Sequence, residues 1–353
     1  MDKNRRTALR AAVAAALLPL AAPALAAGAP ARPAAPASAI NVILPRSVRP
    51  DLDGAAGRRR QERLTLAVMD FVREHYQGRN LPVWRKPATA IDLHKRVANI
   101  CLWVVRSCHA HREVYPVDPA WVAGQIMAES FFNEFAVSWA LAVGICQFIG
   151  PTAREYGLAV AGSAPGHGAA PYKNPADAGA EAEYLAVRRQ WREALRERRR
   201  LGDEGELLRA AMRAHVDGAP CPQAGPYLEA SRAVDELDAK VKDARQRFTA
   251  YLEANFAGRS IFDPGDVAFF KGFDERVLYA KPVDAMVLML ARFLRARGGN
   301  ILAAAAGYHA GLGNTSEDAG VYKRYGRIPA FADTVGYVSR CLVNHHEIAL
   351  RMA

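Results

Sequence analysis

Apolar residues recur every three to four positions along much of the chain, a spacing typical of helices with one buried side. In the first half this spacing is clearest in RRQERLTLAVMDFVREHY, in AIDLHKRVANICLWVVRSCHAHREVY and in DPAWVAGQIMAESFFNEFAVS. The third stretch begins with Asp118 and Pro119, an N-cap residue followed by a proline in the first turn, so we expect a helix to start there. The pattern predicts a mainly α protein.

The first sixty residues have a different composition. Residues 1–26 combine the basic stretch MDKNRRTALR, a short apolar run and the small-residue site Ala24-Leu25-Ala26, which together predict a signal peptide. The pair Arg5-Arg6 is typical of twin-arginine export, and a general secretory signal explains the same residues. Residues 27–60 are rich in alanine and proline and predict an extended linker. No other run is long and apolar enough to span a bilayer, so we expect an exported protein without a transmembrane segment in its mature chain.

Residues 159–270 form a charged, helical segment that differs from the sequence on either side. A loop and a charged helix precede the turn DGAPCPQAGP, and a second helix follows with the four-three apolar spacing of a coiled-coil face. The positions of this face are Ala230, Val234, Leu237, Val241, Ala244, Phe248 and Tyr251. We expect an antiparallel helical hairpin over 177–257, either a solvated structural arm or a contact for a protein partner.

Composition and charge narrow the class of partner. The formal net charge is +11, which suits an anionic polymer. We do not expect nucleic acid as a partner, because no zinc finger, helix-turn-helix or aromatic-basic RNA motif accompanies the charge. The histidine clusters CHAH and NHH lack the spacing of metal ligands, so we expect no metal and no other cofactor. An exported chain with five cysteines leaves at least one unpaired, so buried free thiols are expected, with one disulfide as the alternative.

One carboxylate stands out in the stretch that begins at Asp118. Val122, Ile126 and Glu129 are spaced i, i+4, i+7, which places Glu129 on the expected core side of its helix. A carboxyl group held against apolar walls has a raised pKa and can act as a general acid toward a glycosidic oxygen. The alternative is a buried glutamate that is paired with an arginine. Glu134 is expected roughly 140° around the same helix, so it is not expected to act as a second carboxylate.

The segment AESFFNEFAVSWALAVGICQFIGPTAREYGL resembles the catalytic motif of the soluble lytic transglycosylase (SLT-type) domain. The later stretches AAAAGYHAGLG and GRIPAFADTVGYV are similar to two further motifs of that family, in the same order. The resemblance implies a lysozyme-like catalytic domain in two parts, 61–158 and 271–353, with the helical hairpin inserted between them. A small β-hairpin or turn region is expected after the catalytic helix.

The resemblance also implies roles for single residues. Glu129 aligns with the family's sole catalytic acid and base. The expected substrate-binding residues are Ser138, Gln147, Tyr308, His309 and Asp333. Among these, His309 replaces the family's usual asparagine and Asp333 its usual glutamate. Leu141 and Cys146 are further departures, so the lining of the cleft is expected to differ from that of the family.

The resemblance implies a peptidoglycan lytic transglycosylase, a carbon–oxygen lyase, and together with the predicted signal peptide it indicates the periplasm or cell envelope. It would cleave the β-1,4 bond between N-acetylmuramic acid and N-acetylglucosamine without water and leave 1,6-anhydro ends. A single acid suits this chemistry, because a standard glycosidase needs two carboxylates. Two alternatives remain open from the sequence: a hydrolytic muramidase, and a non-catalytic protein that binds peptidoglycan within an envelope complex.

Overall fold

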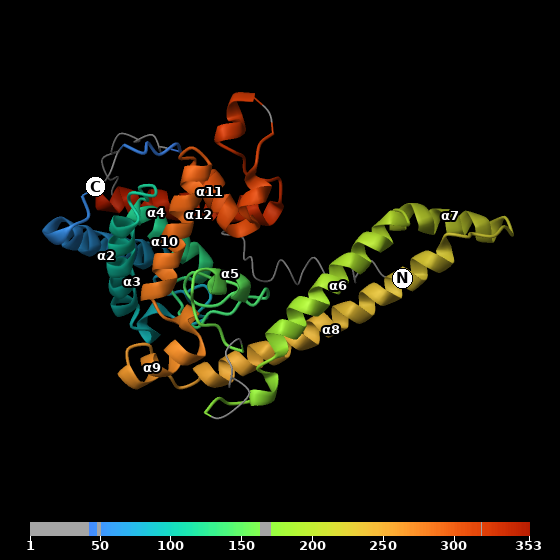
Figure 1. Ribbon diagram of the computed structural model, residues 1–353, viewed down its shortest axis with the longest axis horizontal. Helices are drawn as coiled ribbons and strands as arrows, with labels where there is room; N and C mark the ends of the chain where they lie inside the picture. Colours follow the sequence, from blue (N-terminus) through green and yellow to red (C-terminus); the bar gives the residue numbers. More distant parts are fainter. Residues whose placement is uncertain (1–41, 48–50, 163–170, 319) are drawn as a thin grey trace. The chain divides into compact units, whose positions relative to one another are not determined.

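The computed structural model describes residues 42–47, 51–162, 171–318 and 320–353 of the chain, and these are mainly helical, which confirms the predicted class (Figure 1). The predicted signal peptide 1–26 lies outside the described residues. The α-helices are α2 (Gly54–Tyr76), α3 (Leu93–Ala110), α4 (Pro119–Ser130), α5 (Gly150–Glu155), α6 (Ala180–Arg200), α7 (Glu204–Val216), α8 (Ala224–Phe256), α9 (Pro264–Phe273), α10 (Ala280–Ala296), α11 (Ile301–Ala310) and α12 (Ala332–Met352). Short 3₁₀ turns join several of them, including η3 (Glu275–Val277).

Helix α4 begins where the sequence predicts. The side chain of Asp118 accepts a hydrogen bond from the backbone N–H of Ala120, and Pro119 occupies the first turn. The prediction of a single core-facing side is wrong, however, because every residue from Pro119 to Met127 is buried. A helix that is apolar around its whole circumference is buried on all sides, and here α3 and α12 pack against it.

The close approach of α12 to α4 requires a small residue at position 124. A Cβ atom on Gly124 would lie 2.9 Å from the backbone nitrogen of His345, so a larger residue would force the helices apart. Asn344 donates a hydrogen bond to the carbonyl of Gly124, and His345 is paired with Asp118 at 2.9 Å. Polar groups of α12 thus fix its register on the helix that carries Glu129.

The last residues of the predicted linker 27–60 belong to a helix. Helix α2 begins at Gly54, where Asp53 accepts a hydrogen bond from the backbone N–H of Gly54. Residues 54–60 are therefore helical, although they fall inside the predicted linker 27–60. No helix among the described residues is long and apolar enough to cross a membrane.

Helices α6 and α8 lie side by side over much of their length (Figure 1). The predicted face of α8 forms the seam, and its members are buried or half-buried. The first helix ends earlier than expected, because the chain turns at Gly202 and starts again with Asp203 as the N-cap of α7. The turn DGAPCPQAGP then connects α7 to α8.

An aromatic cluster packs around the C-terminal end of α8. Tyr251 packs against Phe273 with ring centroids 5.4 Å apart, and Phe256 packs against Phe270 at 6.0 Å. Phe135, which follows α4, lies 5.3 Å from Phe256. This end of the hairpin is thereby packed against the segment that follows the helix of Glu129.

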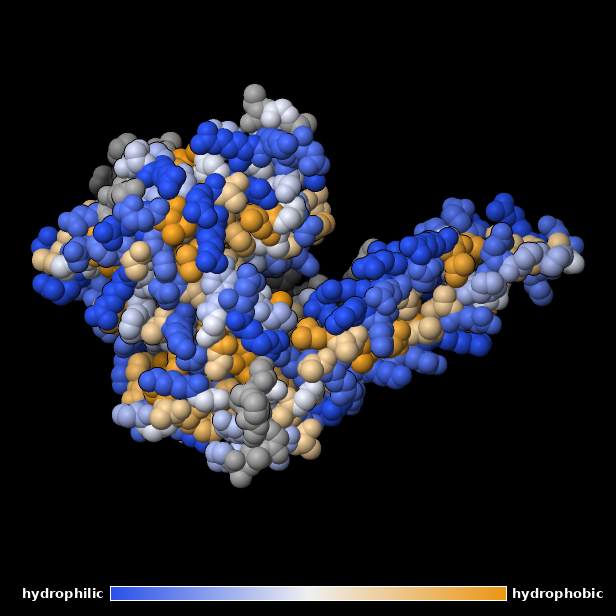
Figure 2. All heavy atoms as spheres, in the orientation of Figure 1, coloured by the Kyte–Doolittle hydropathy of each residue, from blue (hydrophilic) through white to orange (hydrophobic). Residues whose placement is uncertain are grey.

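The α6–α7–α8 end of the hairpin is different, since α7 has no buried residue. Figure 2 shows hydrophobic side chains on its surface among hydrophilic ones. The large apolar residues exposed there are Leu201, Leu208, Met212, Val216 and Leu228.

We expect the two ends of the hairpin to respond differently to truncation. Phe248→Ala should lower the free energy of unfolding by about 3–5 kcal/mol, because its ring is fully buried in the seam. Met212→Ala should change it by less than about 0.5 kcal/mol, because 61% of this side chain is exposed. Urea denaturation followed by circular dichroism measures both, and equal losses would contradict the packing described.

Candidate active site

Glu129 lies in the last turn of α4, where the helix ends abruptly. Phe131 and Phe132 both adopt the left-handed backbone conformation, with φ of 51° and 62°. This conformation is unfavourable for a bulky side chain, and two in succession persist only where the surrounding packing enforces them. Both rings are buried, so core packing ends the helix at Ser130 and leaves Glu129 at the edge of the core.

The surroundings of Glu129 are largely apolar. Burial raises the pKa of Glu129 to about 7, against the opposing effects of Tyr337 and Arg340. The thiols of Cys146 and Cys341 are close enough to be influenced by its charge, and burial raises the pKa of each. Both therefore stay neutral and act as small apolar walls. Glu129 can accordingly hold a proton near neutral pH.

Tyr337 on α12 makes the direct contact with the carboxyl group. Its hydroxyl donates a hydrogen bond of 2.6 Å to Oε1 of Glu129. Burial raises the pKa of Tyr337 well above its ordinary value, which keeps the hydroxyl protonated and able to donate. Because Oε1 accepts this bond, Oε2 is the oxygen on which a transferable proton would reside.

Glu134 is already paired elsewhere. Its carboxylate accepts hydrogen bonds from Nε and Nη2 of Arg96 at 2.8–3.0 Å, and the hydroxyl of Tyr279 lies 3.4 Å away. Glu134 lies beyond the end of α4, so the prediction that it shares a helix with Glu129 is wrong. Within the described residues, no second carboxylate is among the groups that shift the pKa of Glu129.

The segment from Val137 to Phe148, called the site loop below, forms one wall next to Glu129. Isolated antiparallel bridges join Val143 to Val137 and to Phe148. Ser130 ties the loop to α4 by donating its hydroxyl to the carbonyl of Ile145 at 3.0 Å. The loop is thus tied to the same helix end that carries Glu129.

A buried ion pair holds both arms of the site loop. Arg276 and Asp274 are fully buried and paired at 2.6 Å. The guanidinium of Arg276 also donates to the carbonyls of Leu141 (3.3 Å) and Phe148 (3.2 Å). Gly144, with φ of 81°, lies so close that a Cβ there would be 1.9 Å from the carbonyl oxygen of Arg276. The site loop therefore packs directly against the backbone of Arg276, whose side chain it accepts hydrogen bonds from.

Ser138 and Gln147 lie on this loop and partly maintain it. The hydroxyl of Ser138 accepts a hydrogen bond from the N–H of Ala142 at 3.0 Å. The side-chain amide of Gln147 donates to the carbonyls of Ala136 (3.2 Å) and Gly144 (2.8 Å). Among the described residues none donates to the amide oxygen of Gln147, so this acceptor is available to a ligand.

Tyr308, His309 and Asp333 lie on α11 and α12, and only the first two approach the site. Tyr308 donates a hydrogen bond of 2.7 Å to the carbonyl of Cys146, and its pKa is raised by burial and by Glu129 among other groups. The ring of His309 stacks on Tyr337 at 4.7 Å, and its Nδ1 lies 3.1 Å from the hydroxyl of Thr334. Partial desolvation and nearby Arg340 lower the pKa of His309. Asp333 is exposed in the first turn of α12.

Residues 108–186 match the family model of the Transglycosylase SLT domain. The matched range contains Glu129, Ser138 and Gln147, and it extends through α5 into the first turns of α6. It therefore confirms the resemblance to the SLT family at the motif that contains Glu129. Comparisons with curated proteins and with solved structures give no match.

The SLT match indicates the general class of activity. It supports a transglycosylase-type, lysozyme-like enzyme that cleaves the glycan of peptidoglycan. Proteins of this class act in the cell envelope, so the match also supports export. Tyr308, His309 and Asp333 lie outside the matched range, so their roles remain predictions.

Tyr337 is the site residue that the sequence analysis did not assign. It belongs to the third motif, GRIPAFADTVGYV, in which Asp333 was chosen as the substrate contact. Tyr337 follows Asp333 by one helical turn on α12, and it is Tyr337 that is buried against Glu129. Spacing within the motif does not distinguish the two residues, since only the packing of α12 against α4 places Tyr337 at Glu129.

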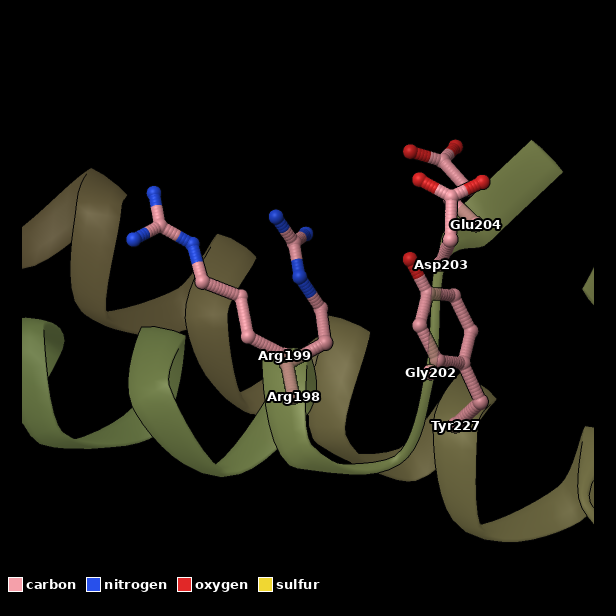
Figure 3. A pocket seen from close by; sticks show the side chains of 6 residues that line it. All are labelled: Arg198, Arg199, Gly202, Asp203, Glu204 and Tyr227. Carbon is pink, nitrogen blue, oxygen red and sulfur yellow. The ribbon is translucent and has the colours of Figure 1, made fainter. Parts of the chain in front are cut away.

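Two other features carry no comparable chemistry. A pocket at the α6–α7 turn is lined by Arg198, Arg199, Gly202, Asp203, Glu204 and Tyr227, with the arginine and the acidic side chains extending in the same direction from the two sides of the turn (Figure 3). Arg199, Asp203 and Glu204 are exposed and Arg198 is half-buried, so this is an open hollow on the surface. In the described part of the chain, no group of three or more His, Cys, Asp or Glu could hold a metal ion.

We expect the contact between Gly144 and Arg276 to be essential to the fold of the site. Gly144→Ala should cost about 3 kcal/mol or more in free energy of unfolding, because its Cβ would overlap a backbone oxygen. Gly157→Ala is the matched control, since φ there is 76° but nothing lies within 4 Å of the added atom. It should cost only about 1–2 kcal/mol. Similar losses in the two variants would show that the site loop is not pressed against Arg276.

The raised pKa of Glu129 predicts a pH-dependent gain in stability for Glu129→Gln. The folded state favours the protonated form, so stability from this group is present below its ordinary pKa of 4.5 and is lost as the pH rises through about 7. The amide cannot ionise and avoids that loss. The variant should gain on the order of 3 kcal/mol relative to the wild type between pH 4 and pH 8. Melting temperatures measured across this range test it, and a constant difference would contradict a buried, perturbed acid.

Proposed function

We propose that the protein is a peptidoglycan lytic transglycosylase in which Glu129 acts first as an acid and then as a base. The observation that carries this proposal is a single glutamate whose pKa burial raises to about 7, and no second carboxylate of the described chain is among the groups that act on it. The substrate would be the β-1,4 bond between N-acetylmuramic acid and N-acetylglucosamine.

In the first step Glu129 would donate its proton, carried on Oε2, to the glycosidic oxygen as the bond from that oxygen to the muramic C1 breaks. Tyr337 supports this step because it holds Oε1 and orients the carboxyl group. In the second step the Glu129 carboxylate would take the proton of the muramic C6 hydroxyl while O6 bonds to C1. Glu129 ends protonated, no water is consumed, and a 1,6-anhydro ring remains. A residue that performs both transfers works best with a pKa near the working pH.

The remaining predicted residues would position the sugars. The free amide oxygen of Gln147 is a hydrogen-bond acceptor on the wall next to Glu129, suited to the hydroxyl or amide groups of an N-acetyl sugar. Ser138 is at the start of the same loop, and Tyr308 lies against its far end through Cys146. We propose that His309 lines the same cleft through its stack on Tyr337, and that Asp333 contacts substrate at the exposed rim.

The hairpin over 177–257 is proposed as the place where a protein partner binds. Leu208, Met212 and Val216 are four residues apart and exposed, so they form an apolar row along one side of α7. Exposed apolar patches with polar surroundings are typical of interaction surfaces. The proposed location is the periplasm or cell envelope, after cleavage of the N-terminal signal peptide.

Digestion of peptidoglycan by the mature protein tests the reaction. Mass spectrometry should detect 1,6-anhydro muropeptides, one water lighter than hydrolytic products. Glu129→Gln should lower kcat about 10²–10⁴-fold, because the general acid is removed. Glu155→Gln is the control, an exposed carboxyl group in the same SLT-matched segment.

Other products would favour the alternatives. Reducing-end products from the wild type would indicate a hydrolytic muramidase. Binding to sacculi without any release of fragments would indicate a non-catalytic envelope protein.

A further inference from the structure

Arg188 on α6 is an unusual cation because its guanidinium lies over two aromatic rings and forms no ion pair within the described part of the chain. Its guanidinium carbon lies 5.5 Å from the ring centroid of Trp139 and 5.6 Å from that of Tyr184. The side chain is half-buried, and burial together with Arg192 lowers its pKa. Among the described residues no carboxylate pairs with it, whereas nearby Arg154 pairs with Glu181 at 2.9 Å. A partly desolvated guanidinium with no counter-charge is suited to an external anion.

Trp139 supplies an apolar surface beside this cation. It directly follows Ser138 in the site loop, and 61% of it is exposed although it is a large ring. A shallow hollow between the loop and α6 begins at the next residue, Ala140. It is also lined by Leu141, Ile149, Leu185, Arg188 and Glu181, and the carboxylate of Glu181 is paired with Arg154. The site is therefore amphipathic, with an exposed aromatic face and a positive charge at one edge.

The hollow and the candidate active site are bordered by the same loop, which contributes Ala140 and Leu141 to the hollow. The loop also carries Gln147 and Cys146, and the thiol of Cys146 is influenced by the charge of Glu129. A polymer that is bound at Glu129 and follows this loop would reach Trp139 and Arg188. Arg188 lies just beyond the SLT-matched range 108–186, so this contact comes from the part of α6 that the family match does not cover.

We propose that Trp139 and Arg188 form a subsite for the carboxylate-bearing peptide stems of the glycan strand. The inference rests on the proposed function, because peptidoglycan carries such stems on its muramic residues. The planar guanidinium would hold a stem carboxylate through two parallel hydrogen bonds, and the indole would cover the apolar part of the stem. The protein would then prefer strands with intact stems to bare glycan.

Binding of two glycan probes tests this subsite without turnover. The mature protein carrying Glu129→Gln is titrated calorimetrically with glycan fragments that bear uncrosslinked stems and with fragments from which an amidase has removed the stems. Adding Arg188→Gln should raise the Kd for stem-bearing fragments about 10-fold or more and leave the Kd for bare fragments unchanged. Trp139→Ala should act in the same direction. Arg189→Gln, an exposed neighbour on α6, is the matched control and should change neither.

The outcomes separate this subsite from a packing role and from the reaction itself. If Arg188→Gln raised the Kd for both probes equally, Arg188 would only pack α6 against the site loop, and the proposal would be overturned. No change with either probe would overturn it as well. Failure of the wild type to form anhydro products would instead refute the proposed reaction, and it would leave the binding difference between the two probes as an independent result.

Discussion

The candidate site depends on the fully buried ion pair between Asp274 and Arg276. Taking two charges out of water costs several kcal/mol per ion, so such a pair is stable only when its remaining donors and acceptors are also used. Arg276 uses them on the carbonyls of Leu141 and Phe148, and Asp274 accepts from the N–H of Ala161. Displacing the site loop would leave donors of a buried cation unsatisfied. The wall beside Glu129 is therefore held in one position.

The segment 274–276, which contains this ion pair, also explains how a long helical hairpin can be inserted without disturbing the site. The N–H of Glu275 donates to the carbonyl of Ala159, and the N–H of Ala159 donates to the Glu275 carboxylate, both at 2.9 Å. These residues lie near the two ends of the predicted insertion 159–270, so the hairpin departs and returns at nearly the same point. Closing such a loop costs an entropy that grows only slowly with its length. The length of the α6–α8 segment therefore has little effect on the arrangement of residues around Glu129.

How much could be predicted from sequence depends on the range of each interaction. The start of α4 depends on Asp118 and Pro119 alone, and the seam of α8 on that helix's own spacing, so both predictions agree with the structure. The burial of α4 on every side depends on α12, far along the chain, and no local pattern contains it. The break at Gly202 was not expected because one glycine is tolerated within a helical pattern.

The same division applies to the site. Glu129 could be identified because its motif is contiguous, and the match to residues 108–186 rests on that stretch. The partner of its carboxyl group could not, because spacing within the third motif does not tell which side chain of α12 reaches α4. The structure selects Tyr337, whose ring is buried, over the exposed Asp333. Likewise, Glu134 is unavailable because of Arg96, a contact between distant segments that only folding reveals.

The pKa of Glu129 is set by opposing effects. Burial raises it, and the position at the C-terminal end of α4 acts in the same direction, because the negative end of a helix dipole disfavours a carboxylate. The hydroxyl of Tyr337 and the charge of Arg340 lower it by favouring the ionised form. In the proposed mechanism, the group would be ionised before the first proton transfer if it were not buried. Without Tyr337 it would hold its proton too strongly for the proposed second transfer. Two-carboxylate enzymes divide these tasks between groups whose pKa values are pushed apart, whereas here a balance of contributions at one residue brings a single value near 7.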